Sequence, residues 1–207
     1  MTISIDGTTG ITLPSGGIAV GTTDSQTLTN KTLTSTTINS GTINSGTINT
    51  PTITGGLSLG TAASLSGTAV NITGIPSWAK RVTVIFSAMS GNGTASPLIQ
   101  IGSAGSVEVT GYAAAGSGGS TTAATSTYTT GFGIRSAAAA DSMSGSMVLH
   151  NITGTTWVSS HVVANSGGSY FLGGGTKTLA DTLDRIRLTF TNGTDSFDAG
   201  TVNIIYE

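Results

Sequence analysis

Residues 27–56 read TLTNK TLTST TINSG TINSG TINTP TITGG, six consecutive blocks of five residues in one register. Each block begins with threonine and places an aliphatic side chain second. These aliphatic residues are Leu28, Leu33, Ile38, Ile43, Ile48 and Ile53. Residues five apart lie about 140° apart around a helix and on opposite faces of a straight strand. The chain must therefore bend about once per block to bring these side chains to one side.

The blocks end at residues suited to bends, Gly41, Gly46 and Pro51. The pattern predicts a β-coil or β-prism around a thin aliphatic column. Six blocks give one chain only about one and a half rungs of a four-sided coil, whereas repeat folds need about three or more stacked units. Three copies around a threefold axis would each supply one side of the coil, so the same six blocks would stack as several shared rungs. We therefore expect a homotrimeric stalk with the six aliphatic residues as its trimer core.

Two alternatives to the trimeric stalk are a single-chain coil and a flexible Ser/Thr/Gly linker. Residues 32–79 contain no charged side chain. An isolated stretch without charge would aggregate or fray. Its composition is easier to explain if most of its surface contacts other copies of the chain.

The composition of the 207 residues restricts the class of protein. The chain has 39 Thr, 27 Ser and 31 Gly, only 8% charged residues and a net charge of −2. Abundant β-branched threonine favours sheets over helices. Seven basic residues argue against nucleic-acid binding, and no apolar run is long enough for membrane insertion. With no cysteine, disulfides and thiolate metal sites are excluded.

The sequence from residue 74 onward predicts a different structure, an all-β domain. Short runs with alternating apolar residues are separated by Gly, Ser and Asn turns, which is typical of a β-sandwich, here expected to be jelly-roll-like. The expected strands are Arg81–Met89, Pro97–Ile101, Ser106–Tyr112, Thr127–Ile134, Ser146–Ile152, Thr156–Ala164, Tyr170–Leu172, Asp184–Thr191 and Thr201–Tyr206. Two Gly-rich stretches, Ala113–Ser126 and Ser166–Thr176, are expected to be loops. The predicted organisation is an N-terminal segment 1–26, a stalk 27–73 and a knob 74–207.

Four aromatic residues border these Gly-rich stretches, and they are the candidate receptor-binding residues: Tyr112, Tyr128, Tyr170 and Phe171. An aromatic ring there would stack on a sugar while loop Ser and Asn side chains form hydrogen bonds. The alternative for each is an ordinary place at the edge of the core.

Catalytic patterns are not recognisable. His150 and His161 lie in apolar strand-like runs, where a structural role is favoured. Asp181 and Asp184 are expected at the start of a strand, and Asp195 falls in a turn sequence rather than an acid pair for glycan cleavage. We therefore expect a protein that is not an enzyme, with no cofactor and no metal site.

Two segments resemble a known group of proteins. Residues 25–34, SQTLTNKTLT, with the Ile-Asn-Ser-Gly blocks that follow, and the opening TISIDGTTGIT at residues 2–12 resemble bacteriophage tail fibres and related virion appendages. The resemblance covers about residues 1–56. It implies trimeric assembly, an N-terminal part that binds other virion proteins, and a C-terminal part that faces outward.

The expected function is therefore that of a phage virion structural protein, a trimeric tail fibre subunit whose knob binds a bacterial surface glycan or protein. Such a protein is made in the cytoplasm of the host bacterium and ends up on the virion, at the tail or the capsid surface. A trimeric capsid decoration or head-fibre protein is an alternative. A capsular polysaccharide depolymerase is a further one, and paired acids for it are not evident.

Replacing Ile43 and Ile48 together with Asp should disperse the trimer, because each carboxylate would be buried in the column next to its own copies. Size-exclusion chromatography with light scattering measures the result. A double variant that elutes at the wild-type size would contradict the shared aliphatic column.

Overall fold

The computed structural model describes residues 11–12, 18–19, 56–119, 124–135, 138–139 and 141–207. The described residues contain no helix, and their strands pair antiparallel, so the predicted all-β class is confirmed. The chain divides into two compact units, residues 1–50 and 51–207. In the first unit, β1 (Ile11–Thr12) pairs with β2 (Ile18–Ala19). The six repeat aliphatics of the predicted trimer core lie outside the described residues.

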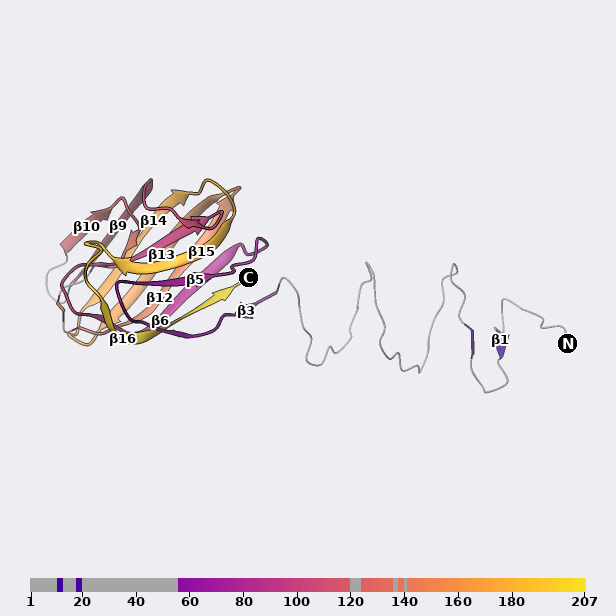
Figure 1. Ribbon diagram of the computed structural model, residues 1–207, viewed down its shortest axis with the longest axis horizontal. Coiled ribbons are helices and arrows are strands. Elements are labelled where there is room, and N and C mark those ends of the chain that lie inside the picture. The colour runs from indigo at the N-terminus through magenta and orange to yellow at the C-terminus, as the bar shows by residue number, and fades with distance from the viewer. Residues whose placement is uncertain (1–10, 13–17, 20–55, 120–123, 136–137, 140) are drawn as a thin grey trace. The chain divides into compact units, whose positions relative to one another are not determined.

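The larger sheet of the second unit has nine strands (Figure 1). In spatial order they are β10 (Ala124–Tyr128), β9 (Tyr112–Gly119), β14 (Tyr170–Thr178), β13 (Thr156–Asn165), β12 (Met143–Thr153), β6 (Arg81–Gly91), β16 (Phe197–Tyr206) and β3 (Ser58–Leu59), and β4 (Ala63–Ser64) also pairs with β16. Three consecutive strands, β12, β13 and β14, form a meander in the middle of this sheet.

The smaller sheet has five strands. They are, in order, β11 (Phe132–Gly133), β7 (Pro97–Ser103), β15 (Leu183–Phe190) and β5 (Ala69–Thr73), and β8 (Ser106–Val107) also pairs with β7. Nine strands facing five, with a central meander, differ from the two four-stranded sheets of a jelly roll. The number of strands in each sheet therefore differs from that of the jelly roll which the sequence suggested.

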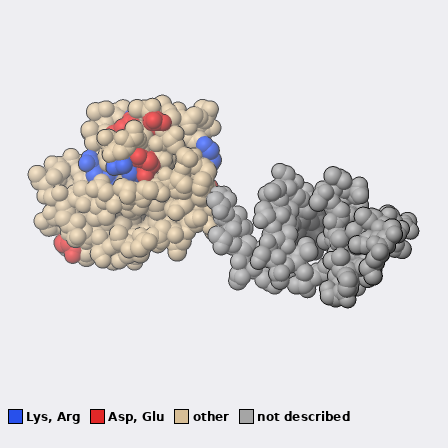
Figure 2. All heavy atoms as spheres, turned by 45° about the vertical axis from the view of Figure 1, so that its right-hand side comes forward, with Lys and Arg blue, Asp and Glu red and all other residues tan. Residues whose placement is uncertain are grey.

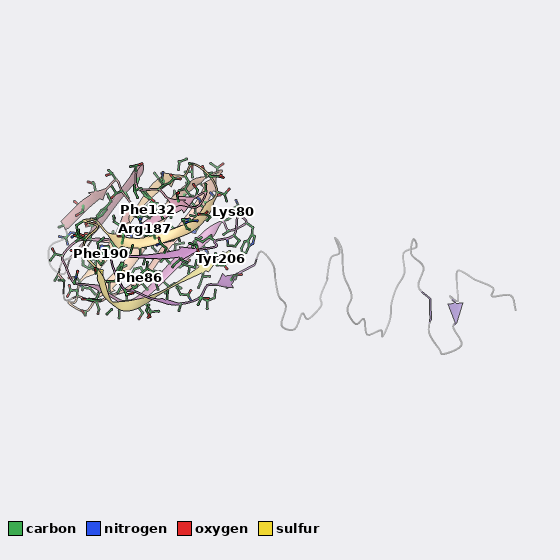
Figure 3. All side chains as sticks on the ribbon, viewed as in Figure 1. Lys80, Phe86, Phe132, Arg187, Phe190 and Tyr206 are labelled. Carbon is green, nitrogen blue, oxygen red and sulfur yellow. The ribbon has the colours of Figure 1, made fainter. Side chains whose placement is uncertain are left out.

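One hydrophobic core joins the two sheets. Alternation along β6 buries Val82, Val84 and Phe86, and the core includes residues of β15 from the other sheet. The ring of Phe190 in β15 lies 4.4 Å from that of Phe197 in β16, measured between centroids. The labelled side chains of Phe86, Phe132 and Phe190 come from both sheets (Figure 3). The second unit is therefore a two-layered β-sandwich.

The two stretches predicted to be Gly-rich loops are largely strands. Ala113–Ser126 contains most of β9 and the start of β10, and Ser166–Thr176 contains most of β14. Glycine is needed at position 173 because the two neighbouring strands lie close to it. A Cβ there would lie 2.5 Å from the carbonyl oxygen of Ala115 and 2.6 Å from His161 Cε1. The loop prediction was wrong because glycine was interpreted as a sign of a turn.

Residues 58–73, which the sequence placed in the stalk, contribute three strands to the sandwich. Strands β3 and β4 pair with β16, and β5 pairs with β15. Within β5, Val70 and Ile72 pack against the hydrophobic core. The first strands of the sandwich therefore precede residue 74.

A largely buried ion pair connects the segment after β8 to β14. A carboxylate oxygen of Glu108 lies 2.5 Å from Lys177 Nζ, and the two side chains are 22% and 7% exposed. The other carboxylate oxygen accepts hydrogen bonds from Ser103 Oγ at 2.9 Å and from the amide of Ala180 at 2.8 Å. Burial raises the pKa of Glu108, but the bonds from Lys177, Ala180 and Ser103 outweigh it and hold that pKa below its usual value.

Glu108→Ala should destabilise the domain by about 3 kcal/mol, because it leaves the Lys177 ammonium buried without its partner. Arg81→Ala is the matched control, since Arg81 pairs with Glu207 at the surface and its loss should change stability by less than about 1 kcal/mol. Urea unfolding followed by tryptophan fluorescence measures both. Equal losses in the two variants would contradict a structural role for the Glu108 pair.

Candidate functional site

The outer face of the nine-stranded sheet carries two long rows of uncharged residues. Because Val82, Val84 and Phe86 point into the core, Thr83 and Ile85 point outward, and residues paired across strands share that face. The first row is Leu59, Ile205, Thr83, Val148, Ser160, Gly174, Ala115 and Thr127. The second row is Asn203, Ile85, Ser146, Val162, Leu172, Ser117 and Thr125.

Several apolar side chains on this face are well exposed. Leu59 is 67% exposed, Val162 69%, Leu172 46% and Ile85 38%. We call the apolar members of the two rows on β3, β16, β6, β12, β13 and β14 the apolar belt: Leu59, Ile205, Ile85, Val148, Val162 and Leu172. Figure 2 shows one side of the molecule, on which several Lys, Arg, Asp and Glu side chains gather near the middle of an otherwise uncharged surface.

A shallow hollow of about 630 Å³ lies where β9, β10 and β14 adjoin. It is lined by Tyr112, Ala113, Ala114, Ala115, Thr127, Tyr128, Thr129, Gly174 and Gly175. No lining residue is charged, and the alanines and glycines leave room above the sheet. Threonine hydroxyls and tyrosine rings next to small apolar groups suit an uncharged ligand that has both hydroxyl groups and apolar faces.

The structure brings two of the four candidate aromatic residues to this hollow. Tyr112 and Tyr128 both line it, although only 4% and 6% of their surfaces are exposed. The Tyr112 hydroxyl accepts a hydrogen bond from the Ile101 amide at 2.8 Å and faces the carbonyl oxygens of Ile101 and Glu108 at 3.1 and 2.9 Å. Burial raises the pKa of Tyr112. The Tyr112 hydroxyl is therefore occupied by hydrogen bonds within the domain. The rings of Tyr112 and Tyr128 form part of the lining of the hollow.

The other two candidates are separate from the hollow. Tyr170 is 55% exposed at the start of β14, on the outer face. Phe171 is 0% exposed because its inward position in β14 places it in the core. The prediction of Phe171 as a receptor contact is therefore corrected. The outer face as a whole was missed, because its rows depend on pairing between strands distant in the sequence.

The carboxylates considered for catalysis hold the backbone in place. Asp195 accepts hydrogen bonds from the Asn192 side chain at 2.7 Å and from the Ala95 amide at 3.0 Å. Asp184 accepts from Arg185 Nε at 2.8 Å, a contact that lowers the pKa of Asp184. Within the ranges that the structure describes, no three His, Cys, Asp or Glu side chains gather in a group that would hold a metal ion.

His161 is 5% exposed on the inner face of β13. Among the described residues, neither of its ring nitrogens has a hydrogen-bond partner, and the hydroxyl of nearby Ser159 has none. Burial lowers the pKa of His161 from 6.5 to about 4. The imidazole is therefore neutral at pH 7 and acts as part of the core.

Comparison of the chain with protein-family models, curated proteins and solved structures finds no match. In the part of the chain that the structure describes, no helix has the length and apolar character that crossing a membrane requires.

His161 should make the domain sensitive to mild acid. The unfolded chain takes up a proton near pH 6.5 and the folded chain only near pH 4, so stability is complete above pH 6.5 and falls as the pH drops towards 4. The expected loss is on the order of 3 kcal/mol. Urea unfolding at pH 7 and pH 4.5 should show that His161→Leu removes most of this loss.

His150→Leu is the control, because His150 is exposed on β12. It should keep the wild-type dependence on pH. If His161→Leu loses as much stability between the two pH values as the wild type does, His161 is not the source of the acid sensitivity.

Proposed function

We propose that the chain is a subunit of a homotrimeric bacteriophage tail fibre, which binds other virion proteins through residues 1–26 and the host surface through its C-terminal domain. The observation that carries the proposal is the six-block repeat of residues 27–56, with an aliphatic residue at the second position of every block of five. A β-coil or β-prism shared by three chains is the fold we propose for that segment.

The hollow on β9, β10 and β14 supports a glycan as the bound group. Its threonine hydroxyls, Thr127 and Thr129, offer hydrogen bonds, and Tyr128 together with the methyl groups of the alanines offers apolar contact. A lining without charge favours a neutral saccharide over an acidic one. Contacts at such a shallow site are individually weak, and three copies in one fibre would raise the overall affinity through avidity.

Adhesion, rather than cleavage, is the activity we propose. Asp184 and Asp195 hold their carboxylates in hydrogen bonds with neighbouring groups of the domain. His161 is 5% exposed on the inner face of β13. These placements support structural roles for the titratable residues that glycan cleavage would otherwise use.

The binding test uses the full chain on an array of bacterial lipopolysaccharide and capsular saccharides. Ala115→Trp places an indole in the hollow at an exposed position and should weaken binding to any saccharide retained by the wild type at least tenfold. Thr73→Trp, an exposed position on β5 of the other sheet, is the matched control and should bind as the wild type does. Equal binding by both variants would contradict a role for the hollow.

The place on the particle is tested by electron microscopy of virions labelled with gold-conjugated antibody against residues 56–207. Gold at the tail is expected. Gold spread over the capsid would instead assign the chain to a decoration or head-fibre protein, and virions without gold would contradict the proposal.

A further inference from the structure

The apolar belt has no cover within the described part of the chain. Leu172 in β14 pairs directly with Val162 in β13, so two exposed aliphatic side chains stand side by side. Two strands further on, Ile85 lies beyond Ser146 in the same row. Exposed apolar area of this kind is unfavourable in water, at about 25 cal/mol per Å². Contiguous apolar patches of this sort mark interaction surfaces.

We propose that the apolar belt is the surface through which the C-terminal domains of sister copies of this chain pack against one another. The inference rests on the trimeric assembly of the proposed function and assigns a face to it. The occupant is a second copy, and the reasons are the shape of the belt, its lack of charge and its connection to the repeat.

The shape of the belt offers both a protrusion and a recess. A hollow of about 200 Å³ is lined by Ser146, Val148, Ser160, His161 and Val162, with small serine side chains on two neighbouring strands. Val162 stands 69% exposed at its margin, and Leu172 lies beside it on β14. In a threefold assembly each contact is heterologous, so an apolar side chain of one copy meets a recess of the next and the ring closes.

The lack of charge also favours a second copy over a saccharide. No residue in either row is charged, so an uncharged partner surface meets the belt without burying an unpaired ion. A saccharide laid on Val162, Leu172 and Ile85 would lose water from its hydroxyl groups without gaining equivalent hydrogen bonds. The belt and the hollow on β9, β10 and β14 therefore suit different partners.

The chain also runs from the repeat directly into the belt. The last block ends at Gly56. Leu57, just before β3, is 70% exposed, and Leu59 in β3 is 67% exposed. Leu59 pairs with Ile205 at the edge of the nine-stranded sheet. Three chains held together by the repeat would therefore present their belts at a high effective concentration, which favours contact between them.

The absence of cysteine in the chain permits a direct test with single-cysteine variants of the full-length protein. Val162→Cys and Thr73→Cys are both exposed positions, the first in the belt and the second on β5. Reaction with a bulky fluorescent maleimide is timed in native buffer and in urea. After normalisation to the rate in urea, Val162→Cys should react at least tenfold more slowly than Thr73→Cys.

A second variant shows that the protection comes from the belt. Adding Leu172→Glu to Val162→Cys should restore fast labelling, and circular dichroism checks that the domain stays folded, as expected for a change at an exposed position. Fast labelling of Val162→Cys in a protein with the mass of a trimer would overturn the belt as the interface while leaving the fibre proposal intact. Fast labelling in a protein with the mass of one chain would overturn both.

Other occupants of the belt give a different result. If Val162→Cys labels rapidly in the pure protein and becomes protected only when lipopolysaccharide vesicles are added, the belt binds the host envelope and the inference is overturned. Protection in the pure protein, removed by Leu172→Glu, supports sister copies as the partner.

Discussion

Burial of the inner face of the nine-stranded sheet against the five-stranded sheet is the interaction on which the domain depends. Val82, Val84 and Phe86 meet a core that includes residues of β15. The layer of core side chains is stabilised mainly by removal of apolar area from water. The five-stranded sheet packs against one face of the nine-stranded sheet, and within the described residues no layer covers the other face. The outer face is left with exposed aliphatic residues and almost no charge.

The sequence predicts most strands of this sandwich, and for several of them it predicts which face is buried. Alternation placed β6, β15 and β16 correctly, because one face of each is buried and period two is visible in the residues themselves. The Gly-rich strand β9 was not predicted, and of β14 only the start, Tyr170–Leu172, was. Their glycines are needed for close contact between neighbouring backbones, which is a property of strand pairing and not of the local sequence.

In the candidate site too, the local sequence predicts some residues, whereas features that depend on strand pairing are not visible in it. Tyr112 and Tyr128 were selected because they border Gly-rich stretches, and the structure places both at one hollow. Phe171 was selected on the same grounds and is in the core, since its side of β14 depends on register. The two uncharged rows unite strands that are far apart in the chain, so no single stretch of sequence shows them.

The outer face of the nine-stranded sheet leaves aliphatic side chains exposed in a single chain, and the repeat of residues 27–56 places an aliphatic side chain in every block of five. We propose that assembly of three copies covers the aliphatic side chains of both segments and gives the proposed fibre several binding sites. The most direct measurement is the native mass of the intact chain at micromolar concentration, by native mass spectrometry. The account predicts a single species of three times the chain mass of 20.4 kDa. A species of 20.4 kDa would contradict it.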